Sequence, residues 1–337
     1  MKFGWRGALG ILLSVLLLVF TLRGVDFGDV ARALRASSIP LFLLATFAGT
    51  LIFPLRARRW KIILAPIDEH IPFAPLWRAT AIGMMVNNVL PARAGELARA
   101  FAITREYPRI PFSASFASLA VDRLFDAFVV LSLMMLAMLD PAFPRGERVA
   151  GQLVSHWLAW GAIVAAVGLL AVYLIVFFPQ HIVRLYQRLA RRLAPRLEER
   201  GKNVLLAFAS GLSVLRSPRR FVAVLAWTVA HWVLNAFAWW IACKAVGIDV
   251  PFSSSFVLQG LIAIGVAIPS APGFFGVFEA LGREGLGLYG VDPTLAVTWA
   301  IGYHLLSFIP ITLIGAYYFV RLGLHFRDLG AAAERAA

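Results

Sequence analysis

The sequence predicts an all-α, polytopic helical membrane protein, and three observations support that prediction. Of the 337 residues, 60% are hydrophobic and 15% are charged, whereas a soluble domain carries about 25% charged residues. The apolar residues lie in long uncharged runs, and a run of roughly 18 residues can cross the hydrocarbon core as a helix. Basic residues gather beside particular runs, as expected of cytoplasmic loops. We expect residues 1–337 to form one transmembrane domain.

Six uncharged runs mark the membrane segments. They cover residues 7–22, 39–55, 149–183, 221–243, 250–278 and 293–320. Lys2 and Arg6 precede the first run, as in a signal peptide, but residues 21–26 offer no small-x-small cleavage site, so we expect a retained first helix. The single cysteine, Cys243, excludes an intramolecular disulfide and a cysteine-based metal cluster, and we expect it to be a packing residue.

Membrane topology explains the net charge of +14 better than nucleic acid does. Ten Lys/Arg residues lie between residues 180 and 220, against two acids. Four more follow the second run: Arg56, Arg58, Arg59 and Lys61. By the positive-inside rule both groups should lie at the cytoplasmic face, near anionic headgroups. We therefore expect membrane lipids as partners, no nucleic acid, and both termini in the cytoplasm.

The two basic groups predict broken hairpins, because two cytoplasmic segments must be separated by an even number of membrane crossings. Residues 111–139 and 155–178 make two crossings, so residues 75–104 must enter and leave on the cytoplasmic side. Their uncharged core, residues 79–92, is too short to span, and we expect a hinge near Pro91. Segments 221–243 and 293–320 then cross outward and inward, so residues 252–289 start and end outside, with a hinge near residues 269–273. Whether their first arm spans fully or re-enters is open.

The result is an inverted repeat of two halves, residues 7–139 and 155–320, each with three spanning helices and one broken hairpin. The hairpins open with Pro72 and Pro251 in similar contexts, and both hinges read Pro-x-x-x-Gly. Proline is also a general helix-start residue, so these echoes give modest support. Interrupted helices in corresponding positions point to a transport site near the midplane. Residues 180–220 alternate apolar residues with arginine and predict interfacial amphipathic helices.

The first hairpin carries three charges at helical spacing, Arg93, Glu96 and Arg99, so that each neighbouring pair can touch. One interpretation is a self-neutralising cluster that pins the hairpin or reaches the interface, because an unpaired arginine is costly in hydrocarbon. The other is an anion site. A half-helix that starts near Pro91 would aim its free N–H groups at the hinge, beside Arg93, as suits a phosphate.

Further charges lie in the next helix and in the second hairpin. Asp122 and Asp126 share a face, and Arg123 could pair with Asp126 or with Glu96, in a structural or a functional role. In the second hairpin, Gly273 permits close backbone approach. Glu279 lies about one turn into the returning helix, where it can pair with Arg283. Four more polar residues interrupt apolar helices and suit either proton relay or helix contacts: His231, Asn235, Tyr303 and His304.

Enzyme motifs are not found in the sequence. It has no His-x-x-x-x-Asp, His-Glu-x-x-His, Gly-x-Ser-x-Gly or Walker pattern, and its intramembrane histidines lack metal-ligand spacing. We expect no catalytic residue, no cofactor and no metal. Transport would therefore run on a gradient or proceed passively.

Three motifs carry a family resemblance. They are Asn87/Leu90/Pro91/Arg93/Gly95/Glu96/Arg99, Asp122/Arg123/Asp126 and Pro272/Gly273/Gly276/Glu279. Together they resemble the flippase-like transmembrane domain found in lysylphosphatidylglycerol synthetases and in stand-alone bacterial and archaeal membrane proteins. Asp122 departs from the family's usual glutamate but keeps its charge. The resemblance implies lipid translocation in the bacterial inner membrane, without the aminoacyl transferase activity of the synthetase domain. It leaves the lipid open among aminoacylated, hopanoid-related and polyprenyl-linked classes.

We therefore expect an integral membrane protein that translocates an amphipathic (phospho)lipid between leaflets. The headgroup would pass through a polar cavity formed by Asn87, Arg93, Glu96, Arg99, Asp122, Arg123, Asp126, Gly273 and Glu279. The arginines would hold phosphate, and the carboxylates would hold counter-charge or a cationic headgroup. Two alternatives are a secondary transporter for a soluble anion and a non-catalytic membrane partner of a lipid-synthesis enzyme. A homo-oligomer is compatible with each.

Overall fold

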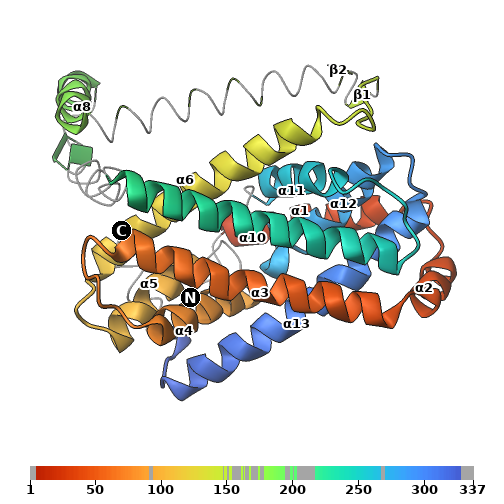
Figure 1. The fold of residues 1–337 in the computed structure, drawn as a ribbon, viewed down its shortest axis with the longest axis horizontal. Coiled ribbons are helices and arrows are strands. Elements are labelled where there is room, and N and C mark those ends of the chain that lie inside the picture. Colours follow the sequence, from red (N-terminus) through yellow and green to blue (C-terminus); the bar gives the residue numbers. More distant parts are fainter. Residues whose placement is uncertain are drawn as a thin grey trace.

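The computed structural model confirms a helical membrane protein (Figure 1). It describes residues 5–90, 94–146, 148–149, 152–153, 161, 163, 167, 174, 178–193, 198–199, 201–202, 217–266 and 270–327. The helices of the first half are α1 (Trp5–Leu22), α2 (Phe27–Ala36), α3 (Ile39–Leu64), α4 (Phe73–Val89), α5 (Gly95–Glu106) and α6 (Phe112–Ala137). A two-residue β-ladder follows, β1 (Arg148–Val149) with β2 (Gln152–Leu153). The remaining helices are α8 (Pro179–Leu193), α10 (Pro218–Ala245), α11 (Ser254–Gly265), η3 (Pro272–Phe274), α12 (Val277–Gly287) and α13 (Pro293–Arg321).

Three of the described helices, α3, α10 and α13, are long and apolar enough to cross a membrane. α6 has 26 residues, but Asp122, Arg123 and Asp126 interrupt its apolar surface. Most of the predicted segment 155–178 lies outside the described residues, so the count of spanning helices stays a prediction.

The antiparallel pair of α3 and α10 forms the centre of the fold (Figure 1). The amide of Ser38, which caps α3, donates to the carbonyl of Ala245 at the end of α10. Ala45 and Ala238 are buried in their shared core, and small residues of this kind let two helices approach closely. Around this pair, α4 packs on α13, and α11 packs on α6.

Both predicted hairpins are present as two short helices joined by a break. α5, α11 and α12 have 12, 12 and 11 residues. At 1.5 Å per residue each reaches roughly 18 Å, well short of a hydrocarbon core of about 30 Å. The described part of α11 is therefore shorter than a full span, and its re-entrant nature stays a prediction.

The breaks differ from expectation in their detail. α5 begins at Gly95 rather than near Pro91, and residues 91–93 lie outside the described residues. A Cβ at Gly83 would lie 2.8 Å from the carbonyl oxygen of Gly95, so α4 and α5 meet backbone to backbone. In the second hairpin, Gly273 and Gly276 adopt φ of 65° and 87°, a region that favours glycine.

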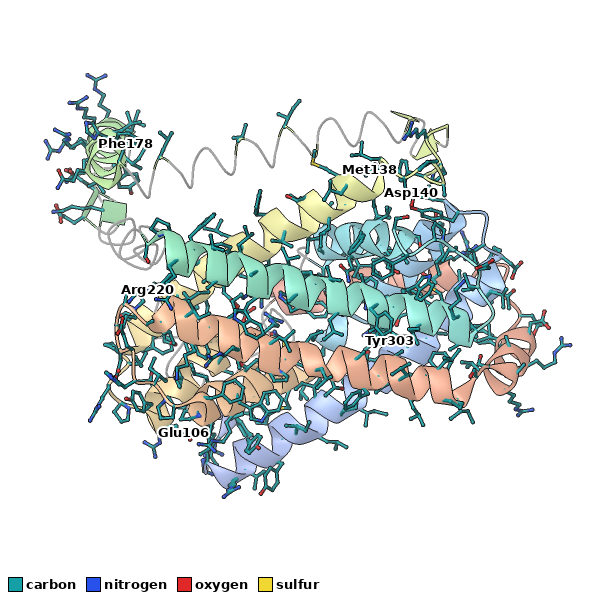
Figure 2. The ribbon with its side chains drawn as sticks, in the orientation of Figure 1. Glu106, Met138, Asp140, Phe178, Arg220 and Tyr303 are labelled. Atoms are coloured by element: carbon teal, nitrogen blue, oxygen red, sulfur yellow. The ribbon has the colours of Figure 1, made fainter. Side chains whose placement is uncertain are left out.

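The hairpins enter from opposite ends of the molecule. Figure 2 shows Glu106, at the end of α5, at one end of the long axis, and Asp140, just before the second half, towards the other. The Tyr107 hydroxyl ties the base of the first hairpin by donating to Asp68 Oδ2 (2.8 Å). Ser253 Oγ ties the base of the second by donating to Asp140 Oδ2 (2.6 Å). This arrangement is compatible with an inverted repeat, and the equivalence of the two halves stays a prediction.

Two smaller expectations can be compared with the structure. Cys243 is buried in the core around α10, as a packing residue should be. In α8, Arg184 and Arg188 are exposed whereas Val183 and Ala190 are buried, so this helix is amphipathic. Most of residues 194–216 lie outside the described residues.

Candidate functional site

A group of seven charged side chains meets between α3, α5 and α6, and we call it the arginine–carboxylate cluster. Its members are Arg56, Arg59, Glu96, Arg99, Asp122, Arg123 and Asp126. Two residues of α10 complete its wall. The indole of Trp232 donates to Asp126 Oδ1 (3.0 Å), and His231 Nε2 lies 3.5 Å from the same oxygen.

Arg59 lies at the centre of the cluster and is completely buried. Its Nη2 lies 2.5 Å from Asp122 Oδ1, and its Nη1 lies 2.6 Å from Asp126 Oδ1. Nη1 also donates to Thr228 Oγ1 on α10 (3.1 Å). Asp122 and Asp126 are four residues apart and therefore share a face of α6, so that one guanidinium can bridge both carboxylates.

This placement corrects the expectation that the basic group after the second run faces headgroups. Arg56 and Arg59 are three residues apart, share the inward face of α3 and are buried. Arg58 is exposed and Lys61 is half-buried. Only the latter two keep the surface position that the positive-inside rule predicted.

Arg99 corrects a second expectation, because its partner is Asp122 rather than Glu96. Arg99 Nη1 donates to Asp122 Oδ2 (3.0 Å), and its guanidinium carbon lies 4.1 Å from the ring centre of Trp60. A cation over an indole face is stabilised by the ring quadrupole. The Nε and Nη2 groups of Arg99 are buried and have no hydrogen-bond partner in the described part of the chain.

The edge of the cluster reaches the surface at Arg123. Its guanidinium pairs with Glu96 and also lies 3.4 Å from Asp126 Oδ2, so both partners that the sequence offered are used. The Arg123 side chain is 39% exposed and that of Glu96 is 23% exposed, whereas Arg59 is fully buried. The charges therefore run inward from a half-exposed edge to a closed interior.

The described members of the cluster do not balance in charge: four arginines face three carboxylates. Arg56 is the least well paired, since its Nη2 lies 3.9 Å from both Asp122 and Asp126 and its Nε has no partner among the described residues. Arginine keeps its proton in proteins, so this positive charge is permanent. A buried guanidinium with unmet N–H groups is costly unless an anion or water meets them.

Asn87 is part of the hinge rather than of the cluster. Its Oδ1 accepts from the amide of Gly95 (2.8 Å), which satisfies the first N–H of α5. That amide is therefore not free for a phosphate, contrary to expectation. Its neighbour Asn88 donates to Thr312 Oγ1 on α13 (2.7 Å). Arg93 lies outside the described residues, and its predicted role is untested.

The second hairpin holds a smaller buried pair, Glu279 and His304. Glu279 Oε1 lies 2.6 Å from His304 Nδ1, and its Oε2 accepts from the amide of Gly276 (2.6 Å). His304 Nε2 lies 2.9 Å from the carbonyl oxygen of Gly273. The predicted partner Arg283 points elsewhere, because its guanidinium donates to carbonyls at the end of α1. Gly273 contributes its backbone and Glu279 its carboxylate, but they do not join the cluster.

Several residues of these two sites were not among the predicted substrate-binding residues. Arg56 and Arg59 were expected at the cytoplasmic face, Thr228 and Trp232 were not singled out, and His231 and His304 were named only as polar residues suited to proton relay or helix contacts. A signal for the first two was present in the sequence, since the two carboxylates of α6 need counter-charges and Arg56 and Arg59 share a helix face. Their pairing nevertheless requires knowing that α3 lies beside α6. No group of three or more metal-ligating side chains was found among the described residues.

Comparisons with known proteins point to the same kind of membrane protein as the motifs do. A UPF0104 membrane protein of Methanothermobacter thermautotrophicus is 23% identical over 327 residues, covering 92% of this chain and 94% of that protein. Another from the same organism is 26% identical over 314 residues, covering 86% and 85%. Glycosyltransferase AglD of Haloferax volcanii is 24% identical over 294 residues, which cover 80% of this chain but 47% of that protein.

The model of one protein family, the lysylphosphatidylglycerol synthase TM region, matches residues 7–315. This match extends over nearly the whole chain and includes both hairpins. The chain therefore belongs to the lysylphosphatidylglycerol synthase TM region family.

Proposed function

We propose that this protein translocates an amphipathic lipid with an anionic, phosphate-type headgroup between the leaflets of the bacterial inner membrane, without catalysing a reaction. The observation that carries the proposal is the uncompensated positive charge of the arginine–carboxylate cluster. Phosphate oxygens are good acceptors for guanidinium N–H groups. An anion beside Arg56 and Arg99 would meet the N–H groups that lack partners.

The shape of the cluster suits a headgroup that moves. A tight static site would satisfy every donor. Here Arg123 and Glu96 are partly exposed, and Arg56 has only weak partners among the described residues: Asp122 and Asp126 at 3.9 Å and the Met84 sulfur at 3.7 Å. A phosphate could move from the arginine at the edge to those in the interior and remain in a region of positive electrostatic potential throughout. The acyl chains would stay in the bilayer, and the name of the family, which refers to a phospholipid, supports a lipid as the substrate.

Orientation follows from the basic residues at one end of the molecule. Figure 2 shows Arg220 at the same end as α8, whose arginines are exposed. We assign this end to the cytoplasm by the positive-inside rule. The first hairpin then enters from the cytoplasmic side and the second from the outside.

The test is lipid movement in proteoliposomes that contain labelled anionic, zwitterionic or lysine-bearing phospholipid. Wild type should move the anionic lipid, and Arg99→Gln should slow it about tenfold or more, because a hydrogen bond to a charged group contributes about 1.5–3 kcal/mol. Arg105→Gln is the matched control, since Arg105 lies on the same helix and is exposed. It should leave the rate unchanged.

Folding defects must be separated from loss of function. Arg56→Gln provides a second variant, because Arg56 has no close carboxylate partner and its loss should disturb folding less than the loss of Arg99. Equal rates for wild type and both variants would contradict the proposal. Uptake of soluble glycerol phosphate into the same vesicles, without lipid movement, would favour the anion transporter.

The relative AglD favours a second candidate, a membrane partner for an enzyme. The present chain corresponds to about half of that protein, whose name is that of a glycosyltransferase. A domain of this family can thus occur in the same chain as a transferase. Under this candidate, cluster variants would keep the enzyme's product level unchanged in cells, whereas deletion of the whole protein would lower it.

A further inference from the structure

The hydrogen bonds of His304 require one more proton than a neutral histidine and an ionised glutamate can provide. The carbonyl oxygen of Gly273 can only accept, so His304 Nε2 must carry hydrogen across their 2.9 Å contact. A neutral ring then has no hydrogen on Nδ1. The 2.6 Å contact of Nδ1 with Glu279 Oε1 therefore needs a second proton, on either the ring or the carboxyl group.

The surroundings trap this proton in the protein interior. Glu279 is 2% exposed and His304 is 8% exposed. The His304 ring stacks on Phe275 and makes a tilted contact with Phe278, with ring centres 4.5 and 4.4 Å away. Nearby aromatic rings stabilise a cationic ring. With its proton the pair is neutral overall, and without it an ionised carboxylate is buried with no counter-charge.

The same pair holds the hinge of the second hairpin. Glu279 binds the amide of Gly276, and His304 binds the carbonyl of Gly273, so the two side chains clamp both ends of the break. The break contains Phe274 at φ 64°, a backbone conformation that residues with a side chain adopt only under constraint. Without the proton, the single N–H of the neutral ring can bind either the Gly273 carbonyl or the Glu279 carboxylate but not both, so the connection between the two ends of the break is lost.

Few other charges reach the pair from the elements packed around it. On α12 the next ones are Arg283, engaged by carbonyls of α1, and the exposed Glu284. The other described contacts around the hinge come from uncharged side chains: Ser14 on α1 accepts from the Ala271 amide, and Trp239 on α10 packs against Phe278 and Tyr303. Among the described residues, no cationic side chain lies close enough to balance the negative charge of Glu279 when the proton is absent.

We infer that Glu279 and His304 form a proton-binding site that latches the hinge of the second hairpin when it is occupied. The ligand is a single proton shared by the two side chains. Bound, it closes the clamp between Gly273 and Gly276, and its release frees the hinge. Insofar as the protein translocates lipid, which rests on the proposed function, this site makes the movement depend on pH.

The first test is solid-state NMR of the protein in bilayers with labelled histidine and glutamate. His304 can be assigned by the through-space correlation of its Nδ1 with the Glu279 carboxyl carbon. At low pH the spectrum should show either a doubly protonated ring or a protonated carboxyl group. A singly protonated ring beside an ionised carboxylate at every pH from about 5 to 9 would overturn the inference.

The second test is hydrogen exchange at the amides of Ala271 and Gly276. In wild type their protection, corrected for the intrinsic pH dependence of exchange, should fall by up to about tenfold per pH unit once the shared proton has been released. In Glu279→Gln the amide side chain can donate to His304 Nδ1 and accept from Gly276 without any extra proton. This variant should stay protected at every pH, whereas the control Glu284→Gln should behave like wild type.

The outcomes separate this inference from the proposed function. If Glu279→Gln shows the same pH dependence as wild type, the latch is wrong. If the hinge responds to pH but no lipid moves in the vesicle assay, the latch stands and the proposed function fails. If Glu279→Gln does not accumulate, the wild-type NMR titration decides alone.

Discussion

The first hairpin is held beside charges that cannot be lost, whereas the second is held by a pair that can. Around α5 and α6, arginines outnumber carboxylates and stay charged at all physiological pH values. Around α12 and α13, one glutamate and one histidine share their hydrogen bonds with the backbone of the hinge. If both proposals hold, the comparison teaches that one fold element can serve two tasks: a permanent positive potential for an anion, and an exchangeable proton that controls a break in a helix.

The two breaks also differ in the side chain that accepts from the backbone: one acceptor cannot ionise and the other can. In the first hairpin an uncharged amide, Asn87, satisfies the first N–H of α5. In the second, the carboxylate of Glu279 accepts from the amide of Gly276, the residue that caps α12. The first break should therefore be insensitive to pH, and the second should respond to it.

Removing the central charge of the arginine–carboxylate cluster beside the first hairpin should have the largest effect. Arg59→Met leaves Asp122 and Asp126 buried without their closest counter-charge, and breaking a buried ion pair in this way costs about 3–5 kcal/mol. We expect little folded protein in membranes, measured by size-exclusion of the detergent extract. The exposed neighbour variant Arg58→Met should accumulate like wild type.

The corresponding change beside the second hairpin, in His304 of α13, should be milder and would sharpen the contrast. In His304→Gln, Glu279 can become neutral by taking up a proton, so the loss is that of buried hydrogen bonds, about 1–3 kcal/mol. A His304→Gln protein as unstable as Arg59→Met would break the comparison.

A tight backbone contact in the first hairpin gives an intermediate effect. In Gly95→Ala the new Cβ would overlap the carbonyl oxygen of Gly83, and forcing extra volume into such a site costs about 1–3 kcal/mol. Gly287→Ala is the matched control in the second hairpin, because a Cβ there meets open space. Thermal unfolding should show a lower Tm for the first variant only, and an unchanged Tm for Gly95→Ala would refute the close packing.

The contacts at the bases of the hairpins should have the smallest effect. Hydrogen bonds from the His70 amide and the Tyr107 hydroxyl lower the pKa of Asp68, and those from Ser253 and the Ala142 amide lower the pKa of Asp140. A carboxylate with a lowered folded-state pKa adds stability above its unfolded value of about 3.8, and this is lost as pH falls through the folded value.

Tyr107→Phe and Ser253→Ala should therefore each lower Tm slightly at neutral pH. The difference from wild type should vanish as the pH falls below the folded-state pKa of each carboxyl group. Tm is measured by thermal unfolding of the detergent-solubilised protein. A difference in Tm that does not depend on pH would mean that these carboxylates are not the acceptors.

Much of the helical organisation could be predicted because it depends on local properties. Uncharged runs gave the long helices, and the prolines and glycines near residues 91 and 273 located both breaks. Charge spacing within one helix also predicted that Arg123 would reach Asp126 or Glu96, and it reaches both. The exact start of α5 was missed, because it depends on the side chain of Asn87.

The sequence by itself determined a helical membrane protein with two broken hairpins and identified most of its intramembrane charges. Hydrophobic length and helix-breaking residues act over a few residues, so they can be read along the chain. Only the tertiary structure decided which charges meet, because Arg59 finds Asp126 across 67 residues and His304 finds Glu279 across 25. Those pairings depend on which helices lie side by side, and helix packing is set by the whole core rather than by any one segment.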